Sequence, residues 1–197
     1  MDLEDGKIAK TAICLLIILL IISLCFNYRH FKDKKTQKDQ YSIFLNHFYF
    51  SIDDSTKIVS EILNEELTGD QLNKELMRLA FSLNKADNLL TESALYLEGV
   101  NHQGITFFQL ASQTIVYGTE YEGKQIHPFG KNFKITQGER AYLNELQKYL
   151  KNMHKRLYSG ETRRDNPGIS KYVFNHDLIP SAREHYFLLD KYAMSDK

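Results

Sequence analysis

The chain has 197 residues, of which 43% are hydrophobic and 25% charged, and its 25 basic residues balance its 25 acidic ones. A neutral chain whose only dense basic tract is one short segment lacks the electrostatic footprint of a nucleic-acid-binding protein. Both cysteines, Cys14 and Cys25, lie in the apolar N-terminal stretch, so the rest of the chain can form neither disulfides nor cysteine-ligated zinc sites.

An apolar stretch from Ile8 to Phe26 dominates the N-terminal region, and no charged residue occurs between Thr11 and Phe26. As a helix it would be roughly 28 Å long, close to the hydrocarbon thickness of a bilayer. Tyr28 follows where an interfacial aromatic residue is expected. We predict an N-terminal tail at residues 1–7 and a single transmembrane helix at residues 8–27, through which the chain contacts the lipid bilayer of the cell membrane.

Two other interpretations of this stretch remain open, a cleaved signal peptide and a lipoprotein signal. The tail is acidic rather than basic, and Ser23-Leu24-Cys25 is a poor cleavage site. Leu24 also stands where a lipoprotein motif needs a small residue, which disfavours lipidation of Cys25.

A basic segment follows the predicted span at residues 28–40, which we expect to be a juxtamembrane linker or a helical continuation of the span. Its cations are Arg29, Lys32, Lys34, Lys35 and Lys38, whereas only Lys7 and Lys10 precede the span. This asymmetry favours a cytoplasmic C-terminal part, while the frequent retention of short N-terminal tails in the cytoplasm favours the opposite side. The same cations could also contact anionic lipid headgroups.

Residues 41–197 suit one domain, and their apolar periodicity is helical. A first stripe, predicting a helix over about 42–66, consists of Phe44, Phe48, Ile52, Ser55, Val59 and Ile62. A heptad stripe, predicting a helix over about 70–98, consists of Leu72, Leu76, Leu79, Leu83, Ala86, Leu90, Ser93 and Leu97. The short connection between the two predicts an antiparallel pair, and the fold class is therefore mainly α, an antiparallel helical bundle behind the transmembrane helix.

Two further helices are predicted downstream, over about 104–117 and 136–158. The first follows from the spacing of Ile105, Phe108 and Ile115, and the second begins at Thr136 and Glu139, which have the spacing of a capping box. The second helix carries its own apolar stripe of Leu143, Leu146, Leu150, Met153 and Leu157.

The connection at residues 118–135 is long for a compact domain and contains three glycines. Its sequence allows a short β-hairpin around Gly123. Within it, Ile126, His127, Pro128 and Phe129 form a possible interaction loop, although Ile126 and Phe129 could instead cover the end of the bundle. A turn-rich linker at residues 159–168 then leads to a C-terminal subregion, residues 169–197, with a last helix starting near Pro180.

No catalytic, cofactor-binding or metal-binding motif is present in the sequence. The seven histidines are dispersed, and none has a second histidine three or four residues away.

The leading hypothesis is therefore a non-enzymatic membrane-anchored module that binds a protein partner or itself, as scaffold or accessory subunit. The alternatives are an extracytoplasmic sensor that binds a small ligand between helices and an unrecognised enzyme, which would need His127 grouped with His154, His176 or His185. The Ile-, Lys- and Tyr-rich composition, without tryptophan, would suit a bacterial protein.

Overall fold

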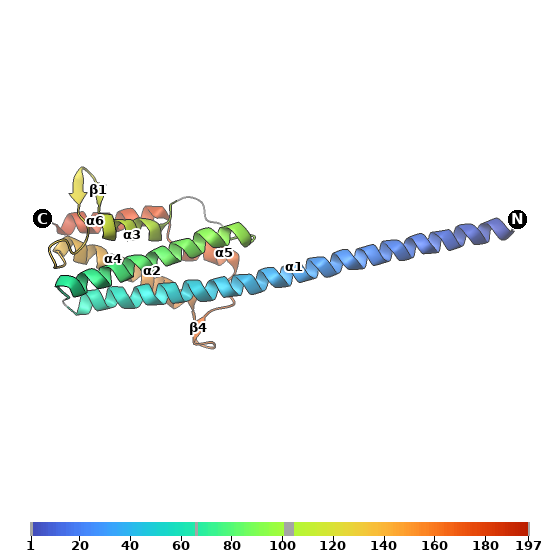
Figure 1. The fold of residues 1–197 in the computed structure, drawn as a ribbon, viewed down its shortest axis with the longest axis horizontal. Helices are drawn as coiled ribbons and strands as arrows, with labels where there is room; N and C mark the ends of the chain where they lie inside the picture. Colours follow the sequence, from blue (N-terminus) through green and yellow to red (C-terminus); the bar gives the residue numbers. More distant parts are fainter. Residues whose placement is uncertain (1, 66, 101–104, 197) are drawn as a thin grey trace. The chain divides into compact units, whose positions relative to one another are not determined.

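The computed structural model describes residues 2–65, 67–100 and 105–196. These residues are mainly helical, with short β-ladders (Figure 1). The chain divides into two compact units, Met1–Tyr41 and Ser42–Lys197.

The first unit consists of the N-terminal part of helix α1, which extends from Asp2 to Asn64. Its apolar window has a mean hydropathy of 1.5, and none of that window is buried. By length and composition, this helix could cross a membrane. Residues 28–40 lie within the same helix.

The second unit contains the remainder of α1 and helices from four further segments of the chain. These are α2 (Gly69–Tyr96), α3 (Phe107–Tyr117), α4 (Gln137–Leu157) and α6 (Ala182–Ser195), with the short α5 (Lys171–Val173) and a π-helical turn η1 (Phe174–Leu178) before α6. Strands β1 (Thr119–Tyr121) and β2 (Lys124–Ile126) pair antiparallel, which confirms the hairpin predicted for residues 118–135.

Helices α1 and α2 lie side by side in the second unit and run in opposite directions (Figure 1). Ser55 of α1 contacts Ser82 of α2, whereas Glu61, further along α1, lies 4.0 Å from Arg78, which comes earlier in α2. The antiparallel direction follows from these two contacts, and it sets which residues of the two helices lie at the same level.

The predicted stripes of α1, α2 and α4 form the core of the second unit, because every residue in them is buried. The aromatic rings of Phe44, Phe48 and Phe174 meet there with centroids 5.1–5.8 Å apart, and Phe108 adds an edge contact to Phe48 at 5.8 Å. Such contacts between rings stabilise a core beyond the apolar area that they bury.

Two details differ from the expectations. Ile105 is 59% exposed and precedes α3, because Thr106 caps this helix by accepting a hydrogen bond from the backbone N–H of Gln109. A second antiparallel ladder, formed by β3 (Tyr158–Ser159) and β4 (Arg164–Asp165), overlaps the predicted linker at residues 159–168. Its buried Asp165 accepts a hydrogen bond from Asn46 at 2.7 Å, a long-range contact that a local pattern does not encode.

Candidate functional site

A surface groove lies between α1 and α2 in the second unit and has a volume of about 660 Å³. Its apolar part consists of Ile58, Met77 and Phe81. Met77 and Phe81 are 56% and 74% exposed, whereas Ile58 is buried. Large apolar side chains this exposed are informative when they adjoin a concave surface, because single ones elsewhere on a protein surface are common.

A second hollow of about 480 Å³ lies on the other side of the same two side chains, towards α3. Met77 and Phe81 line both hollows, so they form a ridge between them. We call these two residues the α2 ridge. Tyr117 of α3, which is 74% exposed, lines the second hollow.

The α2 ridge is exposed because of its position relative to the heptad stripe. Leu76, Leu79 and Leu83 point into the core, and Met77 and Phe81 fall between them on the opposite face of the helix. Their spacing of four residues places them next to each other along that face. This ridge was not predicted from the sequence, although two large apolar residues four positions apart and outside the buried stripe are the signal that indicates it.

The walls of the groove carry charges. The lining residues include Asp54, Lys57 and Glu61 on α1, and Lys74, Arg78 and Lys85 on α2. Lys57 pairs with Asp53 at 2.6 Å, and Arg78 pairs with Glu75 at 2.5 Å. Among the described residues, no ion pair involves Asp54, Lys74 or Lys85.

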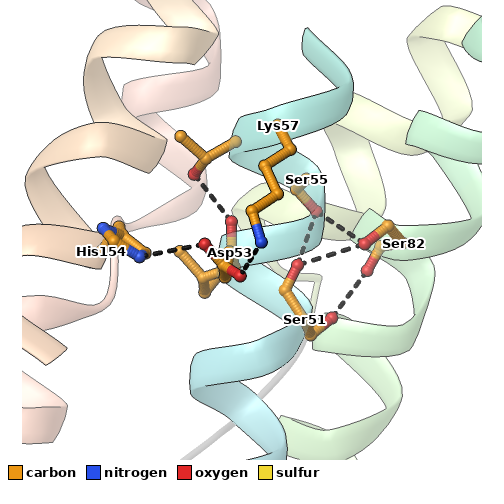
Figure 2. A network of polar contacts seen from close by, with 8 residues as sticks. Ser51, Asp53, Ser55, Lys57, Ser82 and His154 are labelled. Carbon is orange, nitrogen blue, oxygen red and sulfur yellow. Dashed lines mark hydrogen bonds and ion pairs between the residues drawn. The ribbon is translucent and has the colours of Figure 1, made fainter. Parts of the chain in front are cut away.

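Three buried serines join α1 to α2 beside the groove (Figure 2). The Ser51 hydroxyl donates to the carbonyl oxygen of Ser82 at 2.9 Å, and the Ser82 hydroxyl lies 3.1 Å from the carbonyl oxygen of Ser51. The Ser55 hydroxyl lies 2.9 Å from Ser82 Oγ. All three hydroxyls therefore have partners, and their small size lets the two helices approach closely.

A second polar cluster lies on the opposite side of α1, towards α4 (Figure 2). Nε2 of His154 is 3.1 Å from Oδ1 of Asp53, without the geometry of a hydrogen bond, and Lys57 holds the other carboxylate oxygen. The His154 ring stacks on Tyr49 and Tyr158, with centroids 5.3 and 6.3 Å away. Burial, followed by the nearby Asp53 carboxylate, raises the pKa of Tyr49.

A side-chain nucleophile would be needed for the Asp53–His154 pair to act in covalent catalysis. The serines of Figure 2 do not supply one, because Ser51 and Ser55 face α2 and are hydrogen-bonded to Ser82, which lies on that helix. Among the described residues, no group of three or more histidine, cysteine, aspartate or glutamate side chains is placed to hold a metal ion.

A third polar cluster is fully inside the second unit and joins α3, α4 and α6. Nε2 of His185 lies 3.1 Å from Thr114 Oγ1 and 3.0 Å from the Tyr142 hydroxyl. Burial lowers the pKa of His185 to about 4 and raises that of Tyr142. His185 is therefore neutral at pH 7, and its surroundings are those of a satisfied core histidine.

The four residues of the predicted interaction loop differ in how far they are buried. Ile126 and Phe129 are buried, Pro128 is half-buried and His127 is exposed. The Phe129 ring packs edge-on against Tyr142, with centroids 5.1 Å apart. Only His127 thus offers an accessible side chain of the kind that a recognition loop would use.

The remaining predicted positions are spread over the molecule. The histidines named in the sequence analysis contact different partners: His154 lies at Asp53, His176 against Tyr172, and His185 at Tyr142. The five basic residues after the apolar stretch, Arg29, Lys32, Lys34, Lys35 and Lys38, are all exposed on α1.

Comparison with known proteins adds no further constraint. No protein-family model matches the chain, and neither a curated protein nor a solved structure matches it. Functional inference for this chain therefore rests on its own residues and their geometry.

Proposed function

We propose that the chain is a single-pass membrane protein whose helical-bundle domain, residues 41–197, binds another protein chain at the membrane. The span would be residues 8–27 and the basic segment, residues 28–40, would connect it to the domain. Support for the anchor comes from the length and hydropathy of the N-terminal helix.

The observation that carries the binding role is the α2 ridge. Phe81 is 74% exposed and stands between two hollows, so a partner could bury it together with Met77. Large apolar side chains that fill a partner's pocket supply much of the binding energy at protein interfaces. The charged groups around the groove would form a polar rim.

We further propose that the domain lies on the cytoplasmic side. The argument is the excess of lysine and arginine after the apolar stretch, five residues against two. Reporters of opposite compartment preference fused after Lys197 test this, and activity of only the extracytoplasmic reporter would reverse the orientation.

Site-specific photo-crosslinking tests the binding role. A photoreactive phenylalanine analogue replaces Phe81 in the full chain, and irradiated membranes are searched for adducts with other polypeptides. Phe187 of α6 is the matched control, because it is an exposed phenylalanine, 53% accessible, on another element. We expect a discrete protein adduct at position 81 and a much weaker one at position 187. Equal yields at the two positions, or no adduct at position 81, would contradict the proposal.

Membrane extraction tests the anchor independently. The full chain should stay with the membrane pellet after alkaline carbonate washing, whereas a chain lacking residues 8–27 should be released. Release of the full chain would contradict a spanning helix.

A further inference from the structure

We propose that the partner of the α2 ridge is a second copy of this chain, bound face to face through α1 and α2 in a two-fold symmetric dimer. This inference rests on the proposed function, because it names the occupant of the same surface. Its basis is the distribution of charge on the two walls of the groove.

Internal ion pairs remove part of that charge. Lys57 is neutralised by Asp53, and Arg78 by Glu75. The α1 wall then retains Asp54 and Glu61, of which Glu61 is 4.0 Å from Arg78, and the α2 wall retains Lys74 and Lys85. One wall is therefore acidic and the other basic, with no net excess of either sign.

A partner helix that is acidic or basic throughout would be attracted by one wall and repelled by the other. A second copy presents the same two walls, and two-fold symmetry can bring each wall against its opposite. Closed two-fold dimers are also the commonest protein assemblies. Electrostatic complementarity thus favours self-association over a uniformly charged partner.

The antiparallel arrangement fixes which charges would meet. Ser55 contacts Ser82, so Asp54 and Lys85 lie towards the same end of the groove, while Glu61 and Lys74 lie towards the other end. A two-fold axis parallel to the helices places α1 of one copy over α2 of the other at the same level. Asp54 of each copy then faces Lys85 of the other, whereas an in-plane axis across the helices would bring α1 against α1 and like charges together.

The same symmetry accounts for the apolar surface. The α2 ridge stands directly beside the groove, because Met77 and Phe81 line it. When two such faces meet about an axis parallel to the helices, the ridge of each copy lies against the α1 wall of the other copy's groove. Phe81 is 74% exposed in the single chain, and in the dimer the Phe81 side chains of both copies would be covered.

Charge exchange between copies tests the arrangement. Two differently tagged full chains are co-expressed, extracted in mild detergent, and captured through one tag while the other is quantified. We expect Asp54→Lys in both copies, or Lys85→Glu in both copies, to lower co-capture about tenfold, because symmetry turns each change into two like-charge contacts. A chain with Asp54→Lys paired with one carrying Lys85→Glu should recover wild-type co-capture, since every facing pair is again of opposite sign.

The recovery cannot come from contacts within one chain, because each variant chain alone carries like charges at its own positions 54 and 85. Lys151→Glu, an exposed charge reversal on α4, is the control and should leave co-capture unchanged. Wild-type co-capture in both single variants would overturn the dimer, as association through the apolar helix alone would give that result. Failure of the mixed pair to recover would overturn it too. If position 81 still crosslinks to a different protein in that case, the proposed function stands and only the second-copy partner fails.

Discussion

The backbone N–H of Gly130 donates a hydrogen bond to Oε1 of Glu139, 3.0 Å away. The other carboxylate oxygen accepts from the backbone N–H of Thr136 at 2.8 Å, completing the capping box of α4. The carboxylate of Glu139, a residue only 4% exposed, therefore joins Gly130 of the 118–135 connection to the N-cap of α4. Burial raises the pKa of Glu139, and the hydrogen bonds that it accepts act in the opposite direction.

Glu139→Gln should destabilise the protein by about 2 kcal/mol, because the amide nitrogen of glutamine would face one of these two backbone donors and leave it without an acceptor. The measurement is chemical denaturation followed by circular dichroism. Glu145→Gln, in an exposed ion pair on the same helix, is the control and should cost less than about 0.5 kcal/mol. Equal effects of the two substitutions would show that the Glu139 contacts contribute little.

Gly118 and Gly123 make a matched pair at the two ends of β1. Both have positive φ, 73° and 74°, but a Cβ on Gly118 would lie 2.1 Å from the carbonyl oxygen of Ile126, whereas one on Gly123 would meet nothing within 4 Å. Gly123→Ala should cost about 1 kcal/mol from its backbone conformation alone. Gly118→Ala should cost at least about 3 kcal/mol, because two backbone segments must move apart. Thermal denaturation distinguishes the two substitutions. Similar losses of stability would mean that the hairpin backbone can shift at little energetic cost.

Substitutions on the two faces of α2 should differ in how much they destabilise the domain. Phe81→Ser, at a position 74% exposed, should change the free energy of unfolding by less than about 0.5 kcal/mol. Leu83→Ala, two residues away and fully buried, should cost about 2–5 kcal/mol because it leaves a cavity. Urea denaturation at low protein concentration keeps self-association from contributing. A large loss in Phe81→Ser would show that this side chain belongs to the core.

His185 should make stability depend on pH. Its pKa is about 4 in the folded state and 6.5 as the ordinary value, so the unfolded chain binds the proton more tightly. The contribution of neutral His185 to the free energy of unfolding is fully present above pH 6.5. It falls by about 1.4 kcal/mol per pH unit as the pH drops from 6.5 towards 4. His185→Gln should lose this slope, and the exposed His127→Gln should keep it. Denaturation at pH 7.5, 6.0 and 5.0 gives the comparison, and an unchanged slope in His185→Gln would assign the acid sensitivity to other groups.

The helical elements could be predicted because local spacing determines them. The stripe from Leu72 to Leu97 is buried along its whole length, and the Thr136–Glu139 capping box forms as its spacing predicts. The hairpin around Gly123 was predictable for a similar reason, since glycine suits the positive φ of its turn.

The candidate site could not be predicted in the same way. The groove exists only because α1 and α2 run antiparallel with Ser55 at the level of Ser82, and this register depends on contacts between residues 27 and 31 positions apart. The polar clusters have the same origin: Asp53 meets His154, and Thr114 meets His185, only after distant helices have packed. Ile105 was misplaced because its apolar character suited the helix, while the Thr106 cap decided where the helix begins.

The serine contacts between α1 and α2 also restrict how the domain can move. Sliding one helix past the other by one turn, about 5.4 Å, would break the present hydrogen bonds of Ser51 and Ser55 to Ser82, and only the bond from the Ser55 hydroxyl to the Ser51 carbonyl oxygen, which lies within α1, would be kept. Shear between these two helices is therefore an unfavourable motion. Any rearrangement that a binding event produces in this domain should carry α1 and α2 together as one rigid body and be taken up at their contacts with the other helices.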